Sequence, residues 1–510
     1  MGCLIAAPCS GSGKTLLSLC LTASARQRGQ SIQPFKVGPD YLDPQLLAAV
    51  AQRPCRNLDP LLCGAEWVRR CYRWHGSRAD RVLIEGVMGL FDGRGPGSEG
   101  SSAAVAALLD LPVVLVVEAS RQAGSLAALV RGFRDHGPPA VKLAGVVLNR
   151  VGSERHRALL AEALASISVP LLGVLPQHPS LDLPSRHLGL LPPQELDDLG
   201  ERQRLWAQLA EEHLDLERLW PLLEPPVPAK QDTDPISWVL SGLAAEKQAP
   251  AQPPQGPDQP LWQAPTERPT PLPSQQPLPV AIASDAAFHF RYPEASELLR
   301  AVGLEPQPWS PLADDPLPPD CRAVLLPGGY PELHAETLAA SRRSLSQLAQ
   351  AAGAGLPIVA ECGGLLLLGQ QLEDGEGRRH AMAGVLPLTA RRGPLSLGYR
   401  EAEASVDGLL VRRGERLMGH EFHRWQLEAD PTLATAASLW QLEGWGSPRR
   451  AEGWTSANIH ASWLHLHWAG CPGIPRRLAA AAGQFGLQPP NGAFCNPPNT
   501  VSVLPASAGG

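Results

Sequence analysis

The chain begins with a segment whose residue types suit phosphate binding. Residues 4–15 read LIAAPCSGSGKT, which is an apolar strand, a loop of glycine and serine, and the start of a helix. Glycines let backbone N–H groups close around phosphate oxygens, and the helix N-terminus adds a favourable dipole. Lys14 supplies a cation and Thr15 a hydroxyl for Mg²⁺, although Pro8 stands where the usual pattern has glycine. The residues predicted to bind ATP in this loop are Gly11, Ser12, Gly13, Lys14 and Thr15.

Polar side chains at the ends of two other strand-like runs could complete this site. Glu85 directly follows an apolar run, and a phosphate loop needs a second group facing Mg²⁺ at a neighbouring strand end. Asn149 follows the run at 146–148 and could read an adenine edge with its amide, although an asparagine at a strand end is as often a simple cap.

Two further acids, Asp40 and Asp43, follow the strand-like run that ends at Val37. Strand ends in doubly wound folds are where ligands bind, so either acid could face Mg²⁺ or a substrate. Adjacent prolines make a plain turn the alternative interpretation. We expect Asp40 on the metal side, together with Thr15 and Glu85.

A second segment suited to chemistry places a cysteine between a strand and a helix. Residues 357–365 read PIVAECGGL, with Cys362 at the predicted turn. We expect the thiol to lie at a helix N-terminus, where its pKa is lowered. The backbone N–H of Gly363 and that of Gly328 or Gly329 could form an oxyanion hole and help bind the substrate amide.

A nucleophilic thiol needs a base, and two histidines late in the chain could supply it. Residues 461–468 read ASWLHLHW, which puts His465 and His467 on one face of an extended segment, 103 residues after Cys362. Taken singly, a buried cysteine or histidine is more often a plain core residue. Together with the glycine turns, the cysteine and histidine favour a nucleophile with its base.

Alternating strand and helix patterns must position these residues. Short β-branched runs indicate buried parallel strands, and helical periodicity lies between them. The predicted strands are Leu4–Ala7, Val82–Ile84, Val113–Val117, Val146–Leu148, Val280–Ala283, Ala323–Leu326 and Ile358–Ala360. The predicted helices include Lys14–Arg28, Ser101–Leu109, Ala295–Val302 and Ala339–Ala351. The fold class predicted for both halves is α/β, with doubly wound parallel sheets.

Proline marks the boundary between the two halves. The chain has 53 prolines, which are dense between residues 224 and 279 together with glutamine and alanine. Such a segment cannot offset its ordering entropy, so we expect a disordered or polyproline-like linker in which Ile236–Leu240 is an apolar island that could dock. We therefore predict a first domain at 1–223, a linker at 224–279, a second domain at 280–487 and a disordered tail at 488–510.

Composition narrows the classes of function. The 510 residues carry 44 Lys+Arg and 50 Asp+Glu, a net charge of −6, so no overall basic field is available to bind nucleic acid. No run of about 18 apolar residues indicates a membrane span, and the N-terminus lacks the pattern of a signal peptide. We expect a soluble cytoplasmic protein; the sequence does not fix its oligomeric state and is compatible with a homodimer.

Together these motifs resemble those of the cobyrinic acid a,c-diamide synthases, glutamine-dependent amidoligases of the corrin (vitamin B12) pathway. The resemblance covers both halves of the chain and fails in the linker and the tail. The segments that carry it are Ala7–Thr15, Phe35–Asp43, Glu85–Gly93, Leu148–Gly152, Arg186–Leu190, Pro327–Glu332, Ala360–Gly364, Leu397–Arg400, Gly419–His423 and Ala461–His467.

The resemblance implies a dethiobiotin-synthetase-like ATPase domain joined to a class I glutamine amidotransferase domain. It implies that Cys362 is the nucleophile and His465 its base. Many class I amidotransferases carry an acid two residues after that histidine, where this chain has His467, so we expect a Cys–His dyad. ATP and L-glutamine are the implied co-substrates, Mg²⁺ the implied cofactor, and a small tetrapyrrole acid the implied acceptor.

The implied reaction converts two peripheral carboxylates of the macrocycle to amides through acyl phosphates. Ammonia released at the thiol must reach the acyl phosphate unprotonated, so we expect the two sites to share a sheltered interface. Tyr41 and Leu42 are expected to offer an apolar surface to the flat ring, beside Asp43 on the substrate side. Hydrogenobyrinic acid and nickel-sirohydrochlorin are alternative acceptors. A P-loop switch ATPase with a binding module is a distant alternative, which leaves Cys362 and His465 unexplained.

Overall fold

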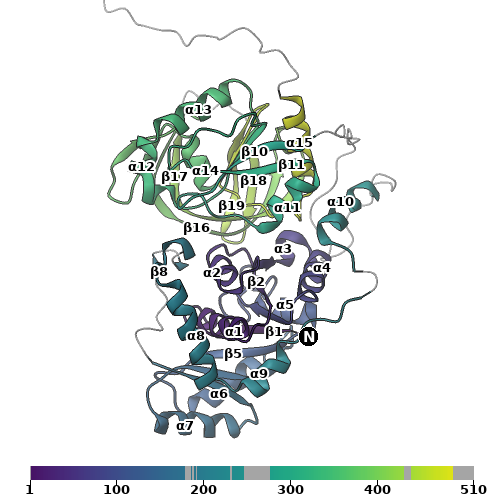
Figure 1. Ribbon diagram of the computed structural model, residues 1–510, viewed down its shortest axis with the longest axis vertical. Coiled ribbons are helices and arrows are strands. Elements are labelled where there is room, and N and C mark those ends of the chain that lie inside the picture. Colours follow the sequence, from purple (N-terminus) through teal and green to yellow (C-terminus); the bar gives the residue numbers. More distant parts are fainter. Residues whose placement is uncertain are drawn as a thin grey trace, which may run out of the picture.

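The structure is a computed structural model of the 510-residue chain. It describes residues 2–177, 185–186, 189–190, 192–229, 232–245, 276–429 and 438–485. Two α/β blocks lie one above the other along the long axis of the molecule (Figure 1). Within the described ranges, no helix combines the length and the apolar character that crossing a bilayer requires.

The first block is built on a sheet of seven parallel strands. Their spatial order is β3 (Arg56–Leu58), β2 (Ile32–Val37), β4 (Arg81–Glu85), β1 (Cys3–Ala6), β5 (Pro112–Glu118), β6 (Lys142–Val151) and β7 (Leu171–Pro176). The chain reverses its direction of winding beside β1, and in such folds ligands bind at the carboxyl ends of the strands at this point.

Helices cover this sheet on both faces (Figure 1). They are α1 (Lys14–Gln27), α2 (Leu42–Ala51), α3 (Pro60–Cys63), α4 (Ala65–Gly76), α5 (Ser102–Leu109), α6 (Ser125–Asp135), α7 (Glu154–Ala165), α8 (Leu199–His213) and α9 (Leu216–Leu222). Small elements are the 3₁₀ turn η2 (Pro193–Glu195) and the pair β8 (Ser185–Arg186) and β9 (Gly189–Leu190). The helix α1 begins directly after the loop that follows β1, so the predicted order of strand, loop and helix is confirmed.

The second block is α/β, as predicted, but its sheet is mixed, so the prediction of a parallel sheet holds for only one part of it. Its parallel part is β11 (Leu304–Trp309), β10 (Leu278–Ala283), β12 (Ala323–Leu326), β13 (Ile358–Glu361) and β20 (Ile459–Ser462). Beyond β20 the sheet continues through β19 (Ser447–Thr455), β18 (Ser438–Gly444), β16 (Leu388–Ala404), β14 (Gln371–Glu373) and β15 (Arg379–Ala381), and β17 (Arg416–Ala429) pairs with β16. The two ends of β16 alternate buried with more exposed residues, as antiparallel strands with one wet face do, and β19 is mostly exposed or half-buried, so neither strand carries the apolar runs from which strands were predicted.

Short helices surround the parallel part of this second sheet. They are α11 (Pro293–Ala301), the 3₁₀ turn η4 (Pro331–His334), α12 (Ala335–Ala340), α13 (Arg342–Gly353), α14 (Gly363–Leu368) and α15 (Gly473–Gln484). The helix predicted at Ala339–Ala351 is divided at Ser341, whose backbone leaves the helical region with ψ of 62°. The remaining predicted helices and all seven predicted strands coincide with observed elements, with differences at their ends.

Part of the proline-rich segment forms a helix, α10 (Pro235–Ala245), contrary to the expectation of an unstructured linker. The apolar island explains the helix, because its side chains are covered by both blocks. The guanidinium of Arg70 on α4 lies 4.7 Å from the ring centroid of Trp238, and Arg476 on α15 donates to the carbonyl of Leu240 at 2.5 Å. Residues 246–275 and 486–510, and the motif residues His187 and Leu188, lie outside the described residues, so the predictions made for them are untested.

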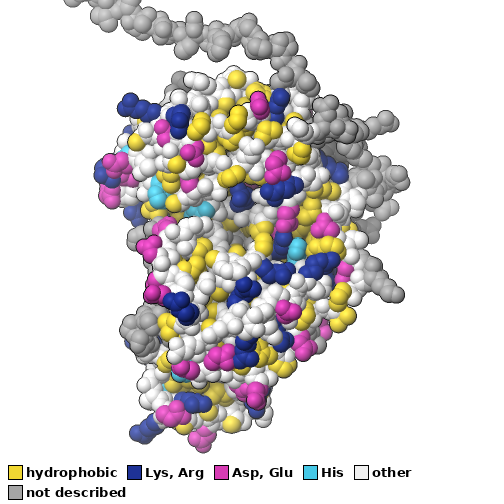
Figure 2. All heavy atoms as spheres, in the orientation of Figure 1, with side chains coloured by type: hydrophobic (Ala, Val, Ile, Leu, Met, Phe, Trp, Pro, Cys, Tyr) yellow, Lys and Arg dark blue, Asp and Glu magenta, His cyan; other side chains and the backbone are white. Residues whose placement is uncertain are grey.

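The two blocks meet through buried polar contacts as well as apolar packing. The contacts that cross the interface include Gln45 Nε2 to the His289 carbonyl (3.0 Å), Arg56 Nη1 to Glu294 Oε1 (2.9 Å), Arg56 Nη2 to Glu297 Oε1 (2.6 Å), Tyr399 Oη to Asp59 Oδ2 (2.9 Å) and an ion pair between Arg94 and Glu401. On the outer face shown in Figure 2, basic and acidic side chains are interspersed over both blocks.

Candidate active sites

The loop after β1 has the backbone conformation that a phosphate-binding loop needs. Gly11 and Gly13 have φ of 80° and 111°, values that favour glycine. Asn149 Nδ2 donates to the Ser12 carbonyl at 3.1 Å, and a Cβ added to Gly13 would lie 2.4 Å from that nitrogen. The amide of Asn149 therefore supports the loop in this structure, and its contact with an adenine base stays a prediction.

Lys14, the first residue of α1, reaches across this loop to the segment that follows β4. Its Nζ donates to the Met88 carbonyl at 2.6 Å, and the residue is 8% exposed. Burial, and then the neighbouring charge of Lys36, lower the pKa of Lys14. A phosphate group bound in the loop would give the Lys14 ammonium group a negatively charged partner.

Thr15 and Glu85 are brought together, as the sequence predicted for the metal side. Thr15 Oγ1 donates to Glu85 Oε1 at 2.8 Å. The other carboxylate oxygen, Glu85 Oε2, is buried and has no hydrogen-bond partner among the described residues. Burial raises the pKa of Glu85. An unpartnered carboxylate oxygen beside a threonine hydroxyl fits a hard cation such as Mg²⁺.

Lys36 at the end of β2 is a residue of this site that the sequence predictions left out. Its Nζ lies 2.8 Å from Glu85 Oε1, 2.5 Å from Asp43 Oδ2 and 3.5 Å from Asp40 Oδ2. Burial acts to lower the pKa of Lys36, but the surrounding carboxylates outweigh it and the pKa is raised well above its usual value. The sequence did contain a sign of this role, because Lys36 stands between a strand-like run and the two acids Asp40 and Asp43.

The pKa values of Asp40 and Asp43 are shifted in opposite directions. Burial and the neighbouring Asp43 raise the pKa of Asp40 to about 7, whereas burial of Asp43 is outweighed by Lys36, which lowers its pKa. Asp40 Oδ1 also accepts the backbone N–H of Leu42 at 2.9 Å. No group of three or more acidic, histidine or cysteine side chains within the described ranges forms a metal cage by itself. A bound Mg²⁺ would therefore also take ligands from phosphate oxygens and water.

Tyr41 and Leu42, predicted to face a flat ring, are buried where the two blocks meet. They are 8% and 6% exposed. The Tyr41 ring stacks on Phe290 with centroids 5.2 Å apart and lies 5.2 Å from the ring of His465. A direct contact with a macrocycle stays a prediction, but the contact with His465 places the first site beside the second.

Cys362 lies at a sharp turn between β13 and α14. Its φ of 47° and ψ of −106° are strained for a residue with a side chain, as at a nucleophile elbow. The expectation that the helix N-terminus lowers the thiol pKa is wrong for this structure. Burial raises the pKa of Cys362, since the side chain is 4% exposed, and the charge of Glu332 adds to this effect. The N–H of Gly363 acts in the opposite direction but does not compensate.

The glycines predicted to line the thiol site make close approaches that a side chain would prevent. A Cβ on Gly363 would lie 3.0 Å from the backbone nitrogen of Gly329, and one on Gly329 would lie 2.0 Å from the Ala287 carbonyl. A Cβ on Gly328 would lie 2.4 Å from Cε1 of His465. The structure therefore brings Gly328, Gly329, Gly363 and His465 together around the turn that carries Cys362.

His465 is fully buried, and neither of its ring nitrogens has a hydrogen-bond partner among the described residues. Burial, and then the neighbouring His420 and His423, lower the pKa of His465 to about 3. The imidazole is consequently neutral near pH 7 and able to accept a proton. Its backbone exchanges two hydrogen bonds with His420, at 2.9 and 3.0 Å, which fixes the extended segment on β17.

The segment 419–423 of β17 forms a wall of the thiol site, a role that residue types alone did not reveal. The Phe422 carbonyl is 3.7 Å from Cys362 Sγ, and the ring of His423 stacks on Trp463 with centroids 3.9 Å apart. On the same segment, the buried Glu421 accepts a hydrogen bond from Arg400 Nε at 2.7 Å. The only signal in the sequence was the match of Gly419–His423 to the motif of the resembling family.

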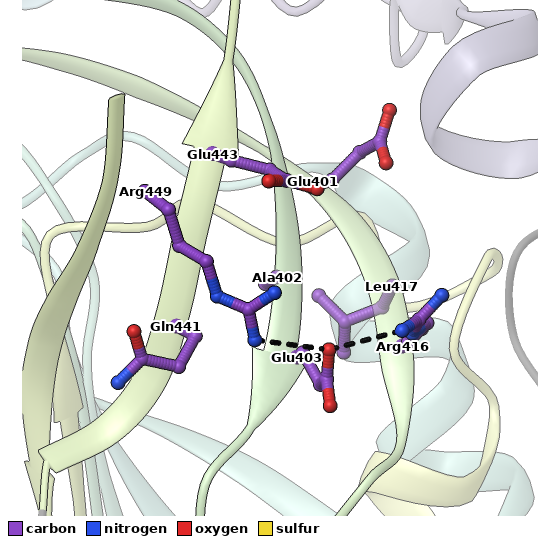
Figure 3. A pocket seen from close by; sticks show the side chains of 8 residues that line it. All are labelled: Glu401, Ala402, Glu403, Arg416, Leu417, Gln441, Glu443 and Arg449. Carbon is purple, nitrogen blue, oxygen red and sulfur yellow. Dashed lines mark hydrogen bonds and ion pairs between the residues drawn. The ribbon is translucent and has the colours of Figure 1, made fainter. Parts of the chain in front are cut away.

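A small pocket, about 20 Å³ in volume, lies away from both sites on the sheet formed by β16, β17, β18 and β19 (Figure 3). In this pocket Glu403 pairs with Arg416 at 3.1 Å and with Arg449 at 3.3 Å. These charges satisfy one another, and the cavity is too small for a tetrapyrrole.

Comparisons with known proteins agree with this division into two sites. Residues 3–191 match the CobQ/CobB/MinD/ParA nucleotide binding domain, and residues 279–472 match the CobB/CobQ-like glutamine amidotransferase domain. The cobyrinate a,c-diamide synthase of Gloeobacter violaceus is 44% identical over 470 residues, which cover 92% of this chain and 94% of that protein. The hydrogenobyrinate a,c-diamide synthase of Streptomyces coelicolor is 43% identical over 487 residues, covering 93% of this chain and 96% of that protein.

Proposed function

Because the chain belongs to the cobyrinate a,c-diamide synthase family, we propose that it amidates the a and c carboxylates of cobyrinic acid, with ATP and glutamine as co-substrates. The observation that carries this proposal is the packing of Tyr41, from the nucleotide-binding domain, against His465 at 5.2 Å. A site that releases ammonia and a site that consumes it have to be adjacent. The two domains are named the synthetase domain and the amidotransferase domain below.

Activation of the carboxylate takes place in the synthetase domain. A carboxylate is a poor acceptor for ammonia because its leaving group would be oxide. Transfer of the γ-phosphoryl group of ATP gives an acyl phosphate, whose leaving group is phosphate. Lys14 and the loop N–H groups would hold the phosphates. Thr15 and Glu85, with Asp40 on the same side, would hold Mg²⁺, which offsets negative charge on the transferring group.

Ammonia is generated in the amidotransferase domain. Cys362 Sγ attacks the side-chain amide carbon of glutamine, and His465 takes up the thiol proton and delivers it to the departing nitrogen. The C–N bond breaks to release ammonia, and water then hydrolyses the thioester to glutamate and the free thiol. The N–H groups of Gly363 and of Gly328 or Gly329 are suited to stabilise the oxyanion.

We infer that the proton is on sulfur before glutamine binds. Burial raises the thiol pKa and lowers that of His465, so the neutral pair is favoured over thiolate and imidazolium. Transfer of the proton therefore accompanies attack on the amide. Release of ammonia inside the buried interface keeps it unprotonated, as attack on the acyl phosphate requires.

Hydrogenobyrinic acid is a second candidate acceptor, because relatives named for both acids match the chain at similar identity. The direct experiment incubates the protein with ATP, Mg²⁺, glutamine and, separately, cobyrinic acid, hydrogenobyrinic acid and nickel-sirohydrochlorin. Each amide formed lowers the product mass by about one dalton relative to the acid, and two steps are expected with the correct acceptor. Turnover of nickel-sirohydrochlorin alone, or of no tetrapyrrole at all, would contradict the proposal.

A further inference from the structure

The residue two positions after His465 is held by a buried contact with another part of the amidotransferase domain. His467 is 1% exposed, and its Nδ1 accepts the backbone N–H of Ala469 at 3.3 Å. The proton of the neutral ring is therefore on Nε2. That nitrogen lies 3.6 Å from Oε2 of Glu294, a residue in the first turn of α11. The ring thus points toward Glu294 and not toward His465.

Glu294 is in turn held from the synthetase domain. It is fully buried, and its Oε1 accepts from Arg56 Nη1 at 2.9 Å. Arg56 lies on β3, is 5% exposed, and also pairs with Glu297 at 2.6 Å. A buried carboxylate is costly unless it is paired and hydrogen-bonded, so Arg56 fixes the position of Glu294. Glu294 Oε2 faces His467 Nε2 at 3.6 Å, which is an ion-pair distance and not a hydrogen bond, and neither atom has a hydrogen-bond partner among the described residues.

Aromatic rings from both domains fix the plane of His467. The ring of Tyr292 lies 4.3 Å from it, centroid to centroid, and Trp67 on α4 approaches with its edge at 6.1 Å. Tyr292 also contacts Tyr41 at 4.6 Å, and Tyr41 lies against His465. Each of the two histidine rings is consequently in contact with an aromatic ring of the synthetase domain.

We propose that Glu294 is a positioning residue of the glutaminase: it fixes His467, and through the backbone of residues 465–467 it orients His465 toward the thiol. Arg56 holds Glu294 in place, so the glutaminase site is complete only while the synthetase domain is engaged. This inference rests on the proposed function and adds to it a route by which one domain controls chemistry in the other.

The test measures glutamine hydrolysis by the full-length chain, without ATP or acceptor, for Glu294→Ala, His467→Ala and the double variant. Each single change is expected to lower kcat by about 10- to 100-fold, because a small misplacement of a catalytic group has effects of this size. KM for glutamine should change less than threefold, since neither side chain binds the substrate. The double variant should be no slower than the slower single variant, because both changes break one contact.

Two further variants separate positioning from general weakening of the interface. Glu401→Ala removes the Arg94 ion pair, which crosses the same interface without touching residues 465–469, and should leave glutamine hydrolysis within twofold of wild type. Arg56→Lys keeps a cation near Glu294 and should retain more activity than Arg56→Met. Ammonia-driven amidation should be unaffected by Glu294→Gln. This variant keeps the size of the side chain and replaces Glu294→Ala if that variant does not fold.

The inference is overturned if the single losses multiply in the double variant, or if Glu401→Ala costs as much as Glu294→Ala. A fall in ammonia-driven amidation that matches the fall in glutamine hydrolysis would also overturn it. Failure of the proposed function has a different signature, because the wild-type chain itself would then produce no tetrapyrrole amide.

Discussion

The two sites differ in how their charged groups are satisfied. In the synthetase domain, Lys36 is paired with Asp43 and Glu85 at 2.5 and 2.8 Å, and all these groups come from one domain. At the thiol site, Cys362 and His465 are both uncharged near pH 7, and His465 has no hydrogen-bond partner among the described residues. There the ion pairs of Glu294 with Arg56 and of Glu421 with Arg400 involve neither Cys362 nor His465.

The two sites therefore differ in how their reactive groups are held before substrates bind. In the synthetase site the carboxylates surround a lysine, so on the proposed function Mg²⁺ and ATP would replace interactions that already exist. At the thiol site Cys362 is a desolvated neutral thiol. Bound glutamine would supply the hydrogen bonds that His465 lacks. The thiol is thereby kept less reactive before glutamine binds, because the thiolate is the more reactive form.

Removal of the cation at the phosphate loop is expected to have the largest effect. Lys14→Ala should lower amidation about a thousandfold or more, because the developing charge of the phosphoryl group loses its stabilising cation. Both glutamine and free ammonia should fail as nitrogen sources, since neither can react without an acyl phosphate. Amidation is measured by product mass, and glutamine hydrolysis without ATP checks that the variant is folded. Ammonia-driven product at the wild-type rate would refute the assignment of this loop.

Removal of the lysine inside the acid cluster tests whether the synthetase site is held by its ion pairs. Lys36→Met leaves buried carboxylates without their partner and should cost about 3–5 kcal/mol of unfolding free energy. In a domain of this size the melting temperature should fall by about 6–20 °C. Arg28→Met is a matched control, because it breaks an exposed pair with Glu211 and should cost about 1 kcal/mol or less. Equal shifts for the two variants would show that the cluster is not a source of stability.

The pH dependence of alkylation tests the neutral thiol. Because burial raises the pKa of Cys362 above its usual value of 9.0, the thiolate is a minor species at pH 7, and its fraction grows with pH up to that raised pKa. The rate of modification by iodoacetamide should therefore rise about tenfold per pH unit from pH 7 to pH 9. Mass analysis of the peptide that contains Cys362 gives this rate separately from that of the exposed Cys9. A rate that is already constant above pH 7 would indicate a thiolate and contradict the comparison.

The proline-rich connection between the domains should matter least. Replacement of residues 246–275 by a glycine–serine segment of equal length should leave both activities within about twofold, because the interface has its own contacts. Ile236→Asp, in the docked helix α10, should be the more harmful change, since it puts a charge into a position that is 7% exposed. Melting temperatures and amidation rates of both variants decide this. A greater loss for the replacement would assign a structural role to residues 246–275.

The sequence predicted those parts of the molecule that depend on local pattern. The loop at Gly11–Thr15, the turn at Cys362 and the parallel strands carry glycine spacing or apolar runs that are visible in one segment. The antiparallel strands β16–β19 were missed because half-buried strands lack such runs. The thiol pKa was misjudged because burial depends on tertiary packing.

Contacts between segments far apart in the sequence could not be predicted. Arg56 and Glu294 have no local pattern that identifies them as partners, since their pairing depends on how the two domains dock. Lys36 has nearby acids, but its contact with Glu85 depends on the pairing of β2 with β4. In each case the charges are satisfied only in the folded chain.

The central claim is that one domain makes ammonia and the other consumes it. Cys362→Ala tests this most directly, with amidation of the tetrapyrrole acid measured by mass using either glutamine or ammonium chloride as the nitrogen source. The account predicts that the glutamine-driven rate falls at least about a thousandfold, because no thioester can form, while the ammonia-driven rate stays within about twofold of wild type. Loss of both rates in a variant with an unchanged melting temperature would contradict the division of labour.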